Sequence, residues 1–329
     1  MKIQELRKLL SASDKERLEK AFAECYKQLR KGQKEEIDPV IVDILEGRAI
    51  DKKKTESTVS FEELEQQIEG FIENAYAQNY FAPNRVIAKS QRPKWRFMVK
   101  NYIKELEKVP FESEYYPRAV KLLSDIYHLI CAACNYYLFS TEDPFRSIGW
   151  EQSNLFELLV KKTFALGYTR VNIAQLLLDA TGGGLSRESL HIEQELVLLG
   201  GLKTSDVKLM AIEEAKKLIE GKTEKLMEKG MHSNRKYYLE EAVNELCGMV
   251  LLISIRLGEP EEGINYYFKY TRMLNREITL YCALDMINII ENDDLWIKVY
   301  EYGVKKRIKP RDCLKDRYEI LKKEKESKI

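Results

Sequence analysis

Apolar residues in this chain recur three and four positions apart in segment after segment, and almost none of them alternate with a period of two. Such spacing places apolar side chains on one face of an α-helix, whereas a half-buried strand needs strict alternation. Residues 61–76 and 95–106 show the pattern most clearly, and Ser60 with Glu63 supplies a capping-box spacing before the first of them. The sequence therefore predicts an all-α protein without significant β-sheet.

Glycine and proline residues agree with this reading. Gly167 and Gly258 follow apolar runs, where a left-handed residue ends a helix at little cost, and Pro144 and Pro260 stand where new helices begin. The short connections favour antiparallel neighbours, so we expect stacked helical hairpins, as in an α-solenoid. The predicted helices span about residues 2–10, 14–31, 34–46, 60–76, 95–106, 115–140, 144–166, 170–181, 186–200, 204–220, 235–257, 260–275, 277–291, 294–307 and 310–326.

Two stretches interrupt the helical pattern and define the predicted organisation. Residues 47–59 lack an apolar stripe and predict an exposed loop after an N-terminal helical unit at 1–46. Residues 181–186 contain three consecutive glycines and predict a soft boundary. This boundary separates a hairpin or bundle region at 60–181 from a C-terminal, repeat-like region at 182–329.

Two segments of the C-terminal region share a plan of small, acidic and aromatic residues. Residues 258–274 read GEPEEGINYYFKYTRML, and residues 292–308, NDDLWIKVYEYGVKKRI, repeat this plan about 33 residues later. The first segment resembles the second helix of a tetratricopeptide repeat with its preceding turn, although Gly263 stands where the family usually has Ala. The resemblance implies a helical-repeat architecture and carries over no ligand-binding residue.

Charge and cysteine usage exclude several classes of protein. The 54 Lys and Arg residues nearly balance the 53 Asp and Glu residues, so a formal net charge of +1 draws the chain to neither nucleic acid nor an anionic membrane. The N-terminal residues lack the continuous apolar core of a secretion signal, and no stretch has the roughly 20 apolar residues of a membrane span. Six scattered cysteines are typical of reduced thiols. We therefore expect a cytoplasmic protein without a membrane partner.

A basic segment at residues 84–104 is the most distinctive local charge feature. It carries no carboxylate, and Trp95, Phe97 and Tyr102 lie among its cations. Cations that bind phosphates, beside rings that stack on bases, are typical of surfaces for single-stranded nucleic acid. The seven cations of the segment are Arg85, Lys89, Arg92, Lys94, Arg96, Lys100 and Lys104.

A second interpretation finds the partner of this charge within the chain. Residues 55–75 carry six carboxylates and no cation. If the two helices form an antiparallel hairpin, the acidic face neutralises the basic face and sets the register, although each exposed pair contributes only about 0 to 1 kcal/mol. Internal pairing is the preferred interpretation, and it places Trp95 and Tyr102 in the core of the hairpin.

Tyrosine doublets suggest a binding groove. Neighbouring helical residues point about 100° apart, so one ring of a doublet can be buried while the other lies at the edge of the apolar face, where it can line a groove. Binding of a protein or peptide is therefore the first functional prediction, and RNA or DNA binding through residues 84–104 is the alternative. The candidate partner-binding residues are Arg92, Lys94, Trp95, Arg96, Tyr116, Tyr137, Tyr238 and Tyr267.

Catalysis is the third interpretation. His191 with Glu193, and Asp179 from the other side of the glycine turn, are the candidate acid–base groups. Cys131 and Cys134 have a spacing found in zinc sites, but their apolar surroundings favour a core helix. The chain contains neither a nucleophile elbow nor a phosphate-binding loop. We therefore expect a non-catalytic protein without a metal or cofactor.

Overall fold

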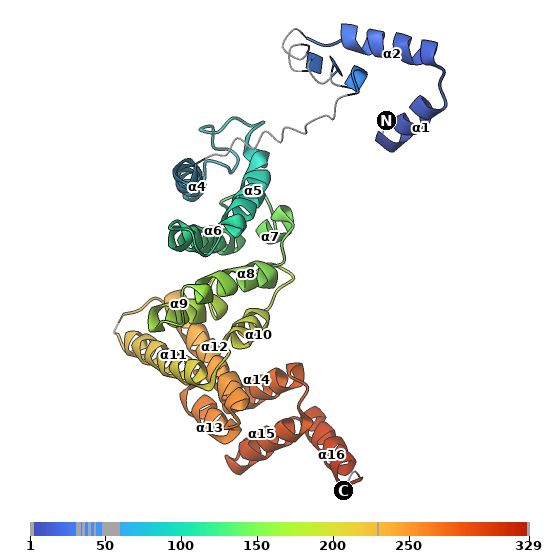
Figure 1. Ribbon diagram of the computed structural model, residues 1–329. Coiled ribbons are helices and arrows are strands. Elements are labelled where there is room, and N and C mark those ends of the chain that lie inside the picture. Colours follow the sequence, from blue (N-terminus) through green and yellow to red (C-terminus); the bar gives the residue numbers. More distant parts are fainter. Residues whose placement is uncertain are drawn as a thin grey trace. The chain divides into compact units, whose positions relative to one another are not determined.

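The computed structural model describes residues 3–30, 34, 37–38, 41–42, 44–47, 60–228 and 230–327 (Figure 1). Every regular element in these ranges is a helix, which confirms the all-α prediction. The chain divides into two compact units, Met1–Val59 and Ser60–Ile329. The predicted loop at 47–59 lies, apart from Gly47, outside the described residues, as do parts of the helix predicted at 34–46.

The first unit contains α1 (Ile3–Ser11) and α2 (Lys15–Lys27). Asp14 caps α2, because its carboxylate accepts a hydrogen bond from the backbone N–H of Arg17 at 2.9 Å. α2 buries none of its side chains.

The second unit carries the other helices whose bounds the structure gives. Ser60 caps its first helix as the sequence predicts, because its hydroxyl oxygen accepts the backbone N–H of Glu63 at 3.2 Å. The helices are α4 (Phe61–Tyr76), η1 (Arg92–Lys94), α5 (Trp95–Lys108), α6 (Tyr116–Asn135), α7 (Pro144–Ile148), α8 (Gln152–Ala165), α9 (Arg170–Ala180), α10 (His191–Gly201), α11 (Ser205–Leu226), α12 (Ser233–Leu257), α13 (Pro260–Tyr270), α14 (Arg276–Ile289), α15 (Asp293–Lys305) and α16 (Asp312–Ser327).

Several predicted helix boundaries are wrong; the helices expected at 115–140 and 260–275 end at Asn135 and Tyr270. The helix expected at 144–166 is two helices, α7 and α8, because Gly149 takes the left-handed conformation (φ +65°) that ends α7. The helix expected from residue 186 begins only at His191. α11 continues through Gly221 to Leu226, since a glycine inside a long helix is destabilising by only about 1 kcal/mol.

In the first half of this unit, α6 is the central helix. It contacts α4, α5, α7 and α8, and its middle is buried on most sides. Trp95 and Tyr102 on α5 are each 4% exposed, so both belong to the core as predicted. The ring of Trp95 stacks on Phe139 with centroids 4.0 Å apart, and Phe71 of α4 contacts the same Phe139.

In the second half, helices that are neighbours in sequence pack together. The pairs α11 with α12, α12 with α13, α14 with α15, and α15 with α16 are in contact, and Figure 1 shows α11, α12 and α13 side by side. Gly263 of α13 lies against α12, where an added Cβ would come within 2.7 Å of Ser254 Cβ and 3.2 Å of the Leu251 backbone. This close approach explains why position 263 requires glycine.

The glycine segment at 181–186, where the sequence predicts a soft boundary, lies inside the second unit. Gly184 packs against the backbone of α6, near the carbonyl of Cys131. Gln152 of α8 is 1% exposed; its amide donates to Gly184 O (3.1 Å) and accepts from Ser186 N (2.8 Å). The segment is therefore fixed to α6 and α8.

Candidate nucleic-acid interface

The seven cations of residues 84–104, here called the basic surface, lie on η1, on α5 and on the loop before them. α5 turns its apolar face to the core and leaves Arg96, Lys100 and Lys104 exposed at four-residue spacing, along one face of the helix. Arg92 is partly buried, because its Nε donates to the carbonyl oxygen of Ile87 at 2.9 Å. The other six cations are exposed.

The acidic helix does not neutralise the basic surface, so the preferred prediction of internal pairing is wrong. Within the described residues, none of the seven cations forms an ion pair with a carboxylate of α4 or of any other element. Glu65 of α4 pairs instead with Arg118 of α6. Glu56 lies outside the described residues. The reason is packing, since α6 contacts both α4 and α5 and its own cation meets the acidic helix.

A cavity of about 390 Å³, here called the basic pocket, opens beside η1. None of its lining residues is acidic, and three of them are cations of the basic surface. Two aromatic side chains that are almost completely buried, Tyr80 and Trp95, form part of its wall. The full lining is Tyr80, Ala82, Lys89, Arg92, Pro93, Trp95, Arg96, Ser140, Thr141 and Ser147.

Three hydroxyl groups of the pocket come from the chain around α7. Thr141 Oγ1 and Ser147 Oγ share a hydrogen bond of 2.7 Å, and Thr141 also bonds the backbone N–H and carbonyl of Asp143. Ser140 Oγ accepts the backbone N–H of Ala82 at 3.3 Å, and its own proton remains available to a ligand. The hydroxyls are thus held in place by the backbone around them.

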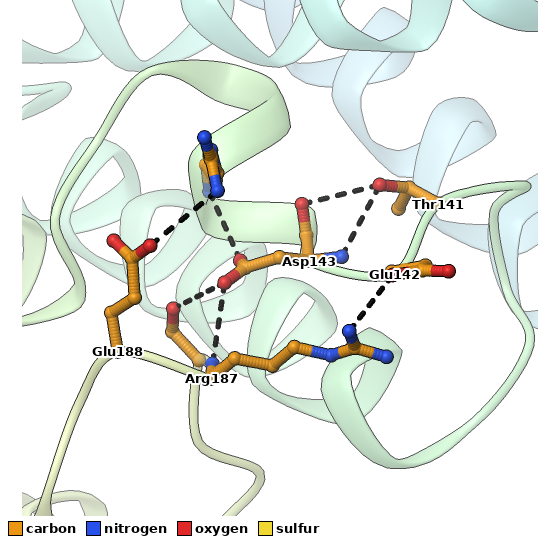
Figure 2. Close-up of polar contacts among 7 residues, drawn as sticks. Thr141, Glu142, Asp143, Arg187 and Glu188 are labelled. Atoms are coloured by element: carbon orange, nitrogen blue, oxygen red, sulfur yellow. Dashed lines mark hydrogen bonds and ion pairs between the residues drawn. The ribbon is translucent and has the colours of Figure 1, made fainter.

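The carboxylate of Asp143, next to the hydroxyl groups of the basic pocket, forms hydrogen bonds outside the pocket (Figure 2). It caps α7 by accepting Arg146 N (3.0 Å), and it accepts Ser186 Oγ (2.7 Å) and Arg187 N (3.2 Å). Burial alone would raise its pKa, but these hydrogen bonds outweigh burial and lower the pKa. Asp143 is therefore an anion that fixes the loop, and Figure 2 shows its carboxylate facing Arg187.

Exposed aromatic rings lie on the segments that supply this wall. Tyr137 is 72% exposed and its ring contacts Phe81 with centroids 5.5 Å apart. The side-chain amide of Gln78 donates to the Tyr137 carbonyl at 3.1 Å, which joins the two segments. Phe97 on α5 is 67% exposed beside Arg96. Cations and exposed aromatic rings therefore occur on the same segments of the second unit.

The four tyrosines predicted as binding residues differ in exposure. Tyr137 and Tyr238 are exposed, at 72% and 66%. Tyr116 and Tyr267 are buried, at 5% and 1%, so their prediction as groove residues is wrong. Each fills a helix contact, and Tyr116 donates its hydroxyl proton to the carbonyl of Lys162 at 3.2 Å. Periodicity could not tell which ring of a doublet faces the core.

The predicted acid–base groups His191, Asp179 and Glu193 are not joined by a hydrogen bond or an ion pair in the described residues. Asp179 instead accepts from Gln175 (2.8 Å) and lies 2.7 Å from His128 Nε2. This hydrogen bond raises the pKa of His128, with burial opposing it. The pair links α6 to α9, and no spacing in the sequence indicates it.

A buried pair of carboxyl groups is likewise not predicted by the sequence pattern. Glu195 of α10 is 1% exposed and lies beside Glu245 of α12, near His191. Burial is the main reason that the pKa of each carboxyl is raised, and the neighbouring carboxyl raises the pKa of Glu195 further. At helical spacing these residues look like ordinary members of charged helix faces. Only the packing of α10 on α12 brings them together.

Cys131 and Cys134, whose spacing is also found in zinc sites, form no metal site in the described residues. Burial raises the pKa of the Cys134 thiol to about 12 and also raises that of Cys131. In the described part of the chain, no three His, Cys, Asp or Glu side chains are grouped to hold a metal ion. None of the helices in that same part has the length and apolarity of a membrane span. No protein-family model, curated protein or solved structure matches the chain.

Proposed function

We propose that this protein is a non-catalytic binding protein and that its basic surface binds single-stranded nucleic acid. The observation that carries this proposal is the group of seven cations, none of which has a carboxylate partner in the described residues. A backbone of phosphates is the ligand that neutralises such a row, and its binding releases counterions. The net charge of +1 confines this attraction to the local surface.

Single strands are favoured over duplex because free rings accompany the cations. Phe97 and the Phe81–Tyr137 pair offer exposed aromatic surface, and unpaired bases stack on such rings with about 1 to 3 kcal/mol per base. In a duplex the base faces are already stacked on each other. The exposed cations Arg96, Lys100 and Lys104 are about 6 Å apart along α5, which suits a strand that follows the helix.

Fluorescence anisotropy with mixed-sequence single-stranded RNA and DNA, at about 50 and 200 mM salt, tests the proposal. We expect binding that weakens steeply between the two salt concentrations. A triple substitution of Arg92, Lys94 and Arg96 to Ala is expected to reduce the slope of log affinity against log salt by about 2, because each single-strand phosphate contact contributes roughly 0.7.

The matched control removes the same charge from α2, by changing Lys15, Arg17 and Lys20 to Ala. The first two of these residues form ion pairs with carboxylates of their own helix region, so the control is expected to leave affinity and slope unchanged. If both triple variants lost affinity equally, binding would depend on total charge, and this result would contradict the proposed site. Absence of binding at low salt would remove the proposed function.

Binding of an acidic peptide is a second candidate function, supported by a groove of about 590 Å³ formed by α13, the connection to α14 and the end of α15. None of its lining residues is acidic. It presents Lys269, Arg276 and Lys306, which form no ion pair in the described residues, together with apolar Leu274, which is 96% exposed. Charge and apolar surface together fit a peptide that carries carboxylates and aliphatic side chains.

Isothermal titration with a peptide of alternating Glu and Leu residues tests this second candidate. Changing Lys269 and Lys306 to Ala is expected to abolish the binding that the unchanged protein shows. Lys216→Ala is the control, because this lysine contacts the ring of Tyr266 outside the groove. A peptide that binds all three proteins equally would exclude the groove.

A further inference from the structure

Five of the seven cations of the basic surface form two arrangements. Arg96, Lys100 and Lys104 form an open row along α5, whereas Lys89, Arg92 and Arg96 converge on the basic pocket. Arg96 belongs to both. An open row suits the successive diesters of a strand, each of which carries one negative charge. A pocket with three cations concentrates more positive charge on one point than a single diester needs.

We propose that the basic pocket receives the terminal phosphate monoester of a single-stranded nucleic acid, whose preceding phosphates follow the row on α5. The inference rests on the proposed function and specifies its ligand. A phosphate monoester carries about −1.5 to −2 charges at neutral pH and three terminal oxygens that accept strong hydrogen bonds. The pocket supplies cations for the charge and the Ser140 hydroxyl as a donor for one of the oxygens.

The donors are placed for this task. Arg92 Nε donates a hydrogen bond to the Ile87 carbonyl oxygen, and Arg96 Nε donates one to the Pro93 carbonyl oxygen at 3.2 Å. The terminal N–H groups of both guanidinium groups therefore remain available to an anion. Ser140 uses its hydroxyl oxygen to accept the Ala82 N–H and keeps its proton. Lys89 forms no ion pair among the described residues.

No carboxylate competes for these donors. The pocket lining contains none, and the adjacent Asp143 is committed to the backbone of α7 and to Ser186. Beside the donors, Tyr80 and Trp95 give the pocket an apolar wall, which reduces solvation of the bound charge and strengthens its contacts. Its volume of about 390 Å³ is within the usual range for a small-ligand site and limits the number of nucleotides that can enter.

The test compares three labelled strands of one sequence and about 12 nucleotides, with a 5′ phosphate, with a 3′ phosphate, or with hydroxyls at both ends. One phosphorylated strand is expected to bind about tenfold more tightly than the hydroxyl strand, the gain of one charge-assisted contact. Ser140→Ala is expected to reduce this preference while it leaves affinity for the hydroxyl strand nearly unchanged. Lys89→Ala removes a cation of the basic surface, so it is expected to weaken the hydroxyl strand somewhat and the phosphorylated strand more, which also reduces the preference. Circular dichroism verifies that both variants fold.

Lys104→Ala is the matched control, because this cation belongs to the row and lies outside the pocket. It is expected to weaken all three strands alike and to keep the preference. Equal affinity for the three strands would overturn the terminal-phosphate pocket and leave nucleic-acid binding intact, whereas no binding to any strand would remove both proposals. A phosphoserine peptide that displaces the phosphorylated strand at equal concentration would reassign the pocket to phosphoprotein.

Discussion

Replacing Gly184 by Ala tests the packing that fixes the glycine segment. The added Cβ would lie 2.1 Å from the backbone oxygen of Cys131 and 3.0 Å from Cys134 Cβ. A real Cβ keeps at least 3.0 Å from such atoms, so the segment or α6 has to move by nearly 1 Å. Because the obstacle is backbone within a central helix, no side-chain rotation can relieve it.

The size of the effect follows from what such a shift disrupts. Overpacking of a close-packed interior destabilises by about 1 to 3 kcal/mol. Movement of the segment also weakens the two hydrogen bonds of the buried Gln152 amide, and an unpaired buried polar group is destabilising by about 1 to 3 kcal/mol. We therefore expect Gly184→Ala to lower the free energy of unfolding by about 3 kcal/mol or more, and Tm by about 6 to 12 °C.

Urea and thermal unfolding, followed by circular dichroism, measure this change against a matched control. Gly70 in α4 has no heavy atom within 4 Å of an added Cβ, so Gly70→Ala is expected to raise the free energy of unfolding by up to about 1 kcal/mol through helix propensity. A Gly184→Ala protein as stable as the unchanged protein would refute the assignment of a close backbone contact, provided that Gly70→Ala behaves as expected.

Two further predictions concern pH. Burial raises the pKa values of Glu195 and Glu245, so the folded protein retains protons that the unfolded chain loses above pH 4.5. The contribution of these protons to the free energy of unfolding is complete below pH 4.5. It is lost as pH rises toward the folded pKa, at about 1.4 kcal/mol per pH unit for each proton. Glu195→Gln should flatten the dependence of the urea midpoint on pH above 4.5, and an unchanged dependence would contradict the buried pair. The pKa of His128 is raised by its bond to Asp179, so its contribution is present below pH 6.5 and is lost as pH rises through the higher folded value. An NMR titration of the ring, assigned with a His128→Gln variant, should give a pKa above 6.5, and a value at or below 6.5 would contradict the pairing.

Features that depend on local interactions could be predicted from the sequence alone. The three- and four-residue spacing of apolar side chains predicted the helices, Ser60 predicted the start of α4, and the seven-residue spacing of Trp95 and Tyr102 placed both in the core. These features depend on residues close in sequence, whose relative directions are set by the helix itself. The cations of the basic surface were also identified in this way.

Contacts between distant residues were decided by the tertiary structure. The sequence matched the acidic helix with the basic one, but α6 packs with both, and Arg118 takes the carboxylate of Glu65. Likewise, the hydroxyls that join Lys89 in the basic pocket come from residues 140–147, which no spacing relates to α5. Helical periodicity determines which face of each helix is buried, whereas which helix covers that face depends on the fit of whole surfaces. That fit left the seven cations of the basic surface without an ion-pair partner among the described residues and brought three of them to one pocket.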